Sequence, residues 1–508
     1  MPSEPSSVTA PRAIVRTPIA VRRINTLDPR RIILVVGVML MGLALFMLPP
    51  MITDLAAGHD DWQIFAISAL ITGFFGTMLA LVSDWQGTES ISRRDGFVIT
   101  AATWLAVSIS GAVPFVLLDR DISIIDGWFE SVSGLTTTGA TVLVGLDRMP
   151  PGVLLWRSIL NWLGGIGIVV MAIIMLPFLR IGGMQLFHTE SSDRSDKIVP
   201  RAGQLVRYIA LSYGILTLAC LIGFVMTGMT LFDAVNHAMS TVATGGYSTH
   251  DASFAYFQNR STVWVGTIFM FLASLPVVLY IRMLRGGSWA IWDDVQVRAF
   301  ALIVGGFIVG LTLWRYLKTG NEFFGVLTEV AFNVVSIIST TGFAYGDYTT
   351  WGAPALGAFF ILTFLGGCTG STSGGIKIFR IQIMWLTVRS YLIGLISPHR
   401  VHKTLYDGRA IGDDVPVAVL AFVSVLFASF MLFSLALMAL GIDFQTSVTG
   451  AATALTNVGP GLGPVIGPAG NFSSLPDTAK ALLAFAMLLG RLEFFTLLVL
   501  LDPSLWRR

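Results

Sequence analysis

The sequence contains few charged side chains, few cysteines and few histidines. Asp, Glu, Lys and Arg make up 12% of the 508 residues, about half the share that is usual in soluble domains, so an ordinary soluble fold is excluded. The two cysteines, Cys220 and Cys368, lie in apolar surroundings and predict neither a disulfide framework nor a cysteine-based metal site. His250, His399 and His402 have no partners at metal-ligand spacing. No convergent acids, histidines or nucleophiles mark the apolar segments, so an intramembrane enzyme is not indicated.

Long apolar segments fill most of the chain, of which 54% is hydrophobic. Ten of them approach the length of about 20 residues that spans a bilayer. They predict membrane-spanning helices at residues 31–53, 62–83, 96–118, 152–180, 205–228, 262–284, 295–317, 353–390, 414–440 and 478–501. The first segment follows a polar tail and lacks a small-residue cleavage site, so we interpret it as a retained helix and not as a signal peptide.

Basic residues predict the orientation of these helices. An even number of crossings places both ends of the chain on one side of the membrane. The Arg-rich tail, Arg507 and Arg508 share that side with the basic connections that follow the even-numbered spans. Because Lys and Arg are enriched on the cytoplasmic side, we expect both termini in the cytoplasm. The basic stretch from Lys377 to Arg409 is explained either by this orientation or by the docking of an acidic partner.

A short pattern rich in threonine and glycine occurs four times, at intervals of roughly 100 residues, in the connections expected to face outward. Each copy follows a stretch that is too short to span a membrane and that fits a re-entrant half-helix. These stretches are residues 126–135, 232–242, 326–339 and 444–455. Such a polar segment cannot face lipid, because its backbone groups would remain unpaired. Four of them can direct carbonyl oxygens at a shared axis, as potassium filters do, so the sequence predicts a cation pore.

The predicted filter consists of three residues from each copy. They are Thr137, Thr138 and Gly139; Ala243, Thr244 and Gly245; Thr340, Thr341 and Gly342; and Asn457, Val458 and Gly459. The closing glycines are expected to hold equivalent places, because glycine adopts unusual backbone angles without steric cost. The half-helices would direct the partial negative charge of their C-terminal ends at the ion path. Four unequal copies depart from the filter of tetrameric potassium channels and predict looser selectivity.

An acidic residue is expected to open each half-helix. The four acids are Glu130, Asp233, Glu329 and Asp443. Capping and interaction with the helix dipole are the favoured explanation, and attraction of cations to the outer mouth is the alternative. Asn236 and His237, on the second half-helix, are expected to pack and to form hydrogen bonds. Residues 161–167, in the fourth span, predict a close-packing surface beside the pore.

The predicted fold is an all-α integral membrane protein. Its unit is a helix, a half-helix, a filter segment and a second helix, and four such units surround one pore. Two further helices precede them. The expected divisions are a tail at 1–30, a two-helix segment at 31–90, and pore repeats at 91–190, 200–290, 294–400 and 411–508.

The four segments resemble the filter segments of Trk/Ktr potassium transporters, specifically of the TrkH type. The resemblance is carried by residues 134–140, 240–248, 339–343 and 455–463, and it extends from about residue 31 to the C-terminus. The extra N-terminal helix pair favours Trk over Ktr. The resemblance implies potassium uptake across the bacterial inner membrane, with K⁺ as the transported ion and no tightly bound organic cofactor. It also implies a homodimer in membrane lipid with one pore per subunit, and a cytosolic nucleotide-binding partner of the TrkA type. No nucleic-acid partner is expected.

The eighth span is too long for one crossing and is interrupted between Phe364 and Lys377. Five glycines and four hydroxyl residues occur there, so helix propensity is very low. Ile376 occupies the lysine position of a Walker loop and excludes that motif. The stretch is either a close-packing patch of small residues or a flexible loop beneath the filter. The resemblance implies the second, a gate that includes Gly366, Gly367, Gly370, Thr372, Gly374 and Gly375.

Arg491 lies within the expected last span, where an ionised side chain is costly and marks a functional site by default. Glu493 is only two residues away and would not face it on a helix. Arg491 is either a structural charge satisfied by loop carbonyls or, as the resemblance implies, a positive charge below the filter. In the second case it acts with the loop to limit conduction.

A secondary transporter is the main competing interpretation. It predicts paired discontinuous helices in two halves, whereas this sequence has one long broken helix and fourfold repetition. An H⁺- or Na⁺-coupled potassium symporter remains the alternative, because coupling does not follow from the sequence.

Overall fold

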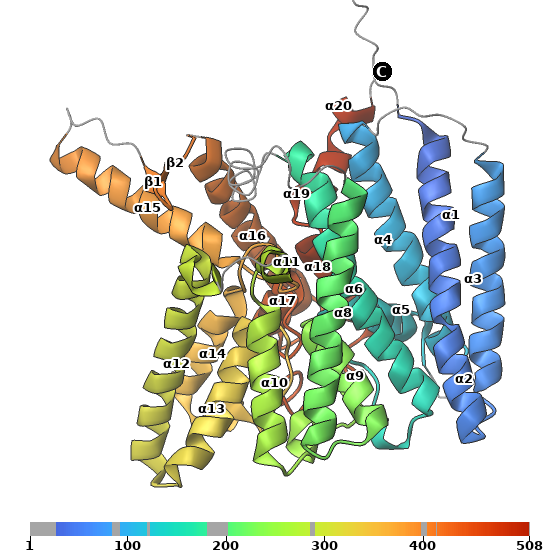
Figure 1. The fold of residues 1–508 in the computed structure, drawn as a ribbon, viewed down its shortest axis with the longest axis horizontal. Helices are drawn as coiled ribbons and strands as arrows, with labels where there is room; N and C mark the ends of the chain where they lie inside the picture. The colour runs from blue at the N-terminus through green and yellow to red at the C-terminus, as the bar shows by residue number, and fades with distance from the viewer. Residues whose placement is uncertain are drawn as a thin grey trace, which may run out of the picture.

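The computed structural model describes residues 27–83, 92–118, 122–179, 202–284, 290–397, 404–412 and 414–506. Helices make up most of this part of the chain and stand side by side as a bundle (Figure 1). One hairpin, β1 (Leu405–Tyr406) and β2 (Arg409–Ala410), is the only sheet among the described residues. Most of the predicted tail, His399, His402, Arg507 and Arg508 lie outside the described residues.

Two spans come first, and four units with one order of elements follow. The first span is α1 (Pro29–Phe46) with α2 (Leu48–Ala57), and the second is α3 (Trp62–Val82). The units contain α4 (Arg93–Val116), α5 (Ile124–Leu135) and α6 (Pro151–Leu179); α8 (Ala202–Met226), α9 (Leu231–Val242), α10 (Arg260–Ala273) and α11 (Val277–Leu284); α12 (Val295–Thr319), α13 (Phe323–Ile338), α14 (Ala353–Phe364) and α15 (Ile378–Ile396); α16 (Asp414–Ala439), α17 (Phe444–Thr456) and α18 (Asp477–Arg491). The chain closes with α19 (Phe495–Leu498) and α20 (Pro503–Trp506). Single 3-10 turns are η1 (Leu146–Arg148), η2 (Ser253–Tyr256), η3 (Ala290–Asp293), η4 (Tyr348–Trp351) and η5 (Val499–Leu501).

Polar caps start three of the four short helices. Ser123 and Asp126 form a capping box at α5, Thr230 caps α9, and Asp443 caps α17. The side chain of Glu322, which precedes α13, makes no capping bond. The short helices end where the threonine- and glycine-rich segments begin, so each unit has the predicted half-helix.

The prediction that an acid opens each short helix holds for two of the four. Asp233 lies in the first turn of α9, and Asp443 is the cap of α17. It is wrong for Glu130 and Glu329, which lie inside their helices because α5 begins at Ile124 and α13 at Phe323. Their role is therefore not capping.

Three of the predicted spans are broken. Residues 365–377 separate α14 from α15, as expected. The sixth span was expected to be continuous but bends by 93° between α10 and α11, because Pro276 lacks a backbone N–H and Leu275 before it is disfavoured in a helix. The last span bends by 102° after Arg491, where Glu493 and Phe494 have positive φ. That break was not expected either, since no proline marks it.

Burial separates the outer helices from those that hold the centre. Only 22% of the apolar window of α3 and of α16 is buried, against 61% of that of α6. The described residues contain eight helices that are long and apolar enough to cross a membrane, or ten if each bent pair counts as one. Helix α15 leaves the bundle obliquely (Figure 1).

Candidate functional site

The four threonine- and glycine-rich segments adopt one backbone conformation. One or two residues after each short helix ends, a residue other than glycine takes a left-handed φ, which is a strained state found mostly at functional sites. These residues are Thr137 (53°), Thr244 (53°), Thr340 (58°) and Asn457 (57°). The next residue donates its N–H to a carbonyl of the short helix, in the pairs Thr138–Ser133 (2.9 Å), Gly245–Ser240 (2.8 Å), Thr341–Ser336 (2.9 Å) and Val458–Thr453 (3.1 Å). The third residue is a glycine with positive φ: Gly139 (82°), Gly246 (75°), Gly342 (82°) and Gly459 (107°).

These segments follow one another around a closed ring. A β-carbon on each of the four glycines would come within 3.0 Å of a backbone carbonyl oxygen of the next segment. The pairs are Gly139 with Gly245, Gly246 with Thr341, Gly342 with Val458, and Gly459 with Thr138. Because the fourth segment returns to the first, backbone packs on backbone all the way round, and only glycine fits at these positions.

The ring corrects the expected register of the second segment by one residue. Gly246, not Gly245, has the positive φ and the carbonyl contact that Gly139 has in the first segment. Gly245 takes the place of Thr138, and Ala243 is the C-cap that follows α9. Because Gly245 and Gly246 are consecutive, either of them could be equivalent to Gly139 from the sequence alone. The position at which α9 ends selects Gly246.

The loop of residues 365–377 lies against the ring on the side where the short helices end. Thr372 Oγ1 donates to the carbonyl of Val242 (3.1 Å) and lies 3.3 Å from Thr244 Oγ1. The backbone N–H of Gly374 donates to Thr340 Oγ1 (2.7 Å). A β-carbon on Gly374 would lie 2.5 Å from the carbonyl oxygen of Thr456. The loop therefore contacts three of the four segments.

Arg491, the last residue of α18, reaches the same loop and is only 3% exposed. Its Nη1 donates to the carbonyl of Thr372 (3.0 Å). Nε and Nη2 have no hydrogen-bond partner among the described residues. A buried structural arginine normally has its donors satisfied, so the carbonyls of the loop satisfy this one only in part.

Two further cations hold the loop, and neither was singled out from the sequence as part of the gate. Lys377 donates to the carbonyl of Ser373. Arg380, at the start of α15, forms an ion pair with Glu493 at 2.5 Å. Because Glu493 belongs to the bend that follows Arg491, this pair joins the exit of the loop to the break in the last span.

The comparisons with known proteins agree with this architecture. The model of the TrkH family, described as a cation transport protein, matches residues 62–507. The chain belongs to the TrkH family. The Trk system potassium uptake protein TrkI of Halomonas elongata is 46% identical over 478 residues, which cover 94% of this chain and 97% of that protein. The Trk system potassium uptake protein TrkH of Escherichia coli is 36% identical over 457 residues, covering 89% of this chain and 93% of that protein. The crystal structure of the potassium transporter TrkH from Vibrio parahaemolyticus superposes with a TM-score of 0.86 at 33% identity and covers 95% of this chain and 100% of that chain.

Sequence reasoning missed the most deeply buried ion pair of this family member. Glu130 on α5 and Arg157 on α6 are 0% and 1% exposed, and Arg157 Nε lies 2.7 Å from Glu130 Oε1. Both residues stand in apolar or small-residue surroundings in the sequence. The signal that could have found them is a charge of each sign on consecutive helices of one unit.

Other charged pairs also connect helices, within one unit or between two units. Lys480 on α18 lies 2.6 Å from Asp126 on α5, and Arg315 on α12 pairs with Glu329 on α13. Glu329 therefore has a partner on the preceding long helix, as Glu130 has on the following one. Ion pairing explains why these two acids lie inside their helices.

The polar residues of α9 have the structural role that was predicted. His237 Nδ1 and Nε2 lie within 2.9 Å of the Asp233 carbonyl and 3.0 Å of Ser248 Oγ. Asn236 Nδ2 donates to the carbonyl of Phe232 (2.8 Å). These contacts join α9 to the chain that leaves the ring.

His250 connects the outer loops of the first two units. Its Nδ1 lies 2.5 Å from Asp147 and its Nε2 lies 3.4 Å from Asp233, while the ring stacks on Tyr256. Burial lowers the pKa of His250, but the carboxylates of Asp233 and Asp147 favour the charged imidazole and leave the pKa raised. The charged imidazole is thereby favoured.

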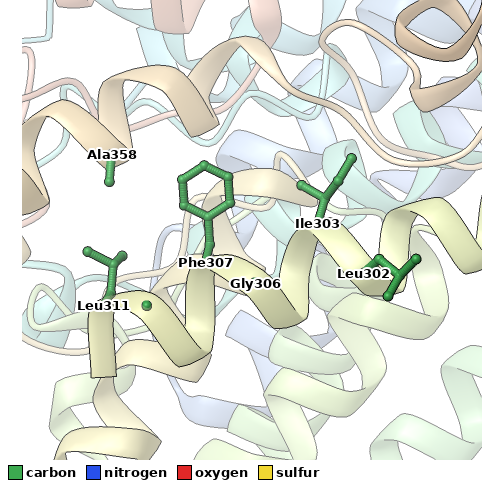
Figure 2. A pocket seen from close by; sticks show the side chains of 7 residues that line it. Leu302, Ile303, Gly306, Phe307, Leu311 and Ala358 are labelled. Carbon is green, nitrogen blue, oxygen red and sulfur yellow. The ribbon is translucent and has the colours of Figure 1, made fainter. Parts of the chain in front are cut away.

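A cavity of about 470 Å³ lies on the outside of the bundle between α12 and α14, away from the ring (Figure 2). Its lining is Leu302, Ile303, Gly306, Phe307, Gly310, Leu311 and Ala358. These side chains offer no ligand to an ion. Within the described part of the chain, no group of three or more His, Cys, Asp or Glu side chains is placed to hold a metal.

Proposed function

We propose that this protein takes up potassium through the ring, whose backbone carbonyls replace the hydration shell of the ion. The observation that carries the proposal is the closure of the ring by four glycine–carbonyl contacts. The names of the relatives, Trk system potassium uptake proteins, support K⁺ as the ion. The proposed filter is Thr137, Thr138 and Gly139; Thr244, Gly245 and Gly246; Thr340, Thr341 and Gly342; and Asn457, Val458 and Gly459. Ala243 is replaced by Gly246 in this set because Ala243 is the C-cap of α9.

The loop and Arg491 form the proposed gate. Support comes from the contacts of Thr372 and Gly374 with three filter segments and from the bond of Arg491 to the Thr372 carbonyl. A cation that passes the filter would meet both the backbone of the loop and a fixed positive charge. The glycines that give the loop its shape are Gly366, Gly367, Gly370, Gly374 and Gly375, of which Gly370 and Gly375 have positive φ.

The proposed setting is the bacterial inner membrane with both termini in the cytoplasm. The distribution of Lys and Arg supports this orientation. A homodimer and a cytosolic nucleotide-binding subunit of the TrkA type are proposed as partners, and the designation of the relatives as parts of a Trk system supports an assembly of several components. The basic connections on the cytoplasmic side would meet that subunit.

Ion flux into proteoliposomes tests the proposal. The purified protein should admit K⁺ and Rb⁺ faster than Na⁺, and a protonophore, which lets H⁺ balance the charge, should not abolish the K⁺ flux driven by its own gradient. Gly342→Ala should remove the preference for K⁺, because the added β-carbon meets the carbonyl of Val458. Gly310→Ala is the matched control, since no atom lies within 4 Å of a β-carbon there. An unchanged ion preference in folded Gly342→Ala would contradict the filter, and collapse of the flux with the protonophore would favour coupled transport.

A further inference from the structure

The buried pair of Glu130 and Arg157 is connected to the ring on both sides. The Glu130 carboxylate accepts hydrogen bonds from Thr141 Oγ1 (3.0 Å), from the N–H of Val142 (3.0 Å) and from Arg157 Nε (2.7 Å). Thr141 and Val142 belong to the chain that leaves the first filter segment, two residues after Gly139. Glu130 thus holds the exit of the first segment, by which we mean the chain that directly follows its filter residues.

The arginine of the pair holds the exit of the second segment. Arg157 Nη1 donates to the carbonyl of Ser248 (2.8 Å), and its guanidinium carbon lies 4.1 Å from the centroid of the Tyr247 ring. Tyr247 follows Gly246 directly. Its hydroxyl donates to the Glu130 carbonyl at 2.7 Å and lies 3.4 Å from that of Ala140. Two neighbouring segments are therefore joined through one ion pair and one tyrosine.

The third and fourth segments are held in a different way. Ser336 Oγ donates to the Phe343 carbonyl (2.6 Å), and Asn333 bonds with both the N–H and the carbonyl of Tyr345 (3.1 and 2.9 Å). Thr449 makes the corresponding bonds with Leu462 (3.1 and 3.3 Å). Each of these exits is bound by neutral side chains of its own short helix. Only the first two exits share a charged clamp among the described contacts.

Breaking a buried charge pair on one side is costly, because the remaining charge has no solvent. A complete pair in a well-bonded site resists displacement more strongly than neutral hydrogen bonds do, since bonds to charged groups contribute roughly twice as much. The clamp therefore resists any change in the spacing of the first two segments. In a ring of carbonyls, that spacing decides how well the site matches a dehydrated K⁺ instead of the smaller Na⁺.

We propose that Glu130 and Arg157 are positioning residues for ion selectivity: they fix the first two segments relative to each other and so prevent the ring from contracting around Na⁺. The proposal rests on the filter function proposed above. Neither residue touches the ion. The spacing between the first and second segments is thus fixed by an ion pair, whereas the third and fourth segments are held by neutral hydrogen bonds.

The test measures the K⁺/Na⁺ permeability ratio in proteoliposomes. Arg157→Lys keeps the charge opposite Glu130 but loses the second arm of the fork that reaches Ser248. We expect the ratio to fall by about tenfold, which corresponds to the loss of one hydrogen bond to a charged group. The K⁺ flux itself should persist, and the response to Arg491→Gln should be unchanged, because the gate lies on the other side of the ring.

A double variant, Glu130→Gln with Arg157→Gln, removes both charges and leaves none unpaired. It should lose selectivity to the same degree as Arg157→Lys or more. Tyr247→Phe removes only the hydroxyl bonds and should lower the ratio by a smaller factor. Size-exclusion chromatography and thermal unfolding in detergent would establish that the variants are folded.

A ratio unchanged from the parent in folded Arg157→Lys and in folded Tyr247→Phe would overturn the proposal. If Gly342→Ala in the same assay still abolishes the K⁺ preference, the filter stands and only the clamp is refuted. If neither change affects the ratio, the filter assignment fails as well. A fall in flux with the ratio unchanged would mean a purely structural ion pair, and would also overturn the proposal.

Discussion

The ring and the loop beneath it have similar compositions and are held in place very differently. Both are rich in glycine and hydroxyl residues, and both are irregular backbone inside a helical bundle. In the ring, four glycines each meet a neighbouring backbone carbonyl, so main chain supports main chain. The loop is held to the ring mostly by side chains, through Thr372 and the hydroxyl of Thr340, and the guanidinium of Arg491 on α18 holds the loop from outside the ring.

Because of this difference, the ring is rigid, whereas the loop can be released. Moving one segment of the ring requires its neighbours to move, because interiors packed to this density transmit strain. Releasing the loop from the ring breaks a few hydrogen bonds, each of which contributes about 0.5–1.5 kcal/mol net. Ion choice should therefore respond to changes in the ring, and the amount of flux to changes in the loop.

The largest effect is expected at Gly246, which tests the ring and its register together. Gly246→Ala places a β-carbon against the Thr341 carbonyl at a residue with φ of 75°, so the K⁺/Na⁺ permeability ratio should fall to near one. Ala243→Gly changes the C-cap of α9 and should keep the ratio of the parent. Proteoliposome flux with each cation gives both numbers. If Ala243→Gly is the variant that loses selectivity, the second segment has the register first expected from sequence.

The next effect concerns the charge beneath the ring. A fixed unit charge about 4 Å from a K⁺ costs on the order of 1–4 kcal/mol for effective dielectrics between water and a protein surface. Since about 1.4 kcal/mol is tenfold in rate, Arg491→Gln should raise basal K⁺ flux by several-fold to several-hundred-fold. Arg491→Lys should retain most of the block. Flux that does not change in folded Arg491→Gln would make the arginine structural.

A smaller effect is expected for the hydroxyl that holds the loop. Thr372→Ala removes the bond to the Val242 carbonyl and the contact with Thr244, so K⁺ flux should rise by about tenfold at most while the ion preference stays that of the parent. Combined with Arg491→Gln, it should gain less than the product of the two changes, because both act on one barrier. Thr404→Ala, in the connection between α15 and α16, is the control. A changed permeability ratio would show that the loop takes part in ion choice.

The sequence predicted the ring and the loop because their signals are local. Four similar segments, each after a short apolar stretch, and one glycine-rich break can be recognised in the sequence without knowledge of tertiary contacts. The bend after Pro276 was available in the same way but was missed in a long apolar run. The break after Arg491 has no local signal, since Glu493 and Phe494 take positive φ without glycine or proline.

The register of the second segment and the ion pairs depend on distant contacts. Whether Gly245 or Gly246 closes its segment is decided by the Ser240 carbonyl and by the neighbouring Thr341. The partner of Glu130 is 27 residues away, and that of Glu493 is 113 residues away. Pairings of this kind follow from how the helices pack, which composition and periodicity do not specify.

The smallest expected effect concerns pH and the outer loops that join the first two segments. His250 contacts Asp147 and Asp233, stacks on Tyr256 and lies edge-on to Phe257. Its pKa is raised above the unfolded value of about 6.5. A raised pKa contributes stability that is fully present below about pH 6.5 and is lost as pH rises through the folded pKa. The unfolding temperature in detergent should therefore fall slightly across this window in the parent. In His250→Gln, which cannot ionise, that part of the pH dependence should be absent. If both proteins follow the same curve, the histidine is neutral in the folded state and the outer loops are held without its charge.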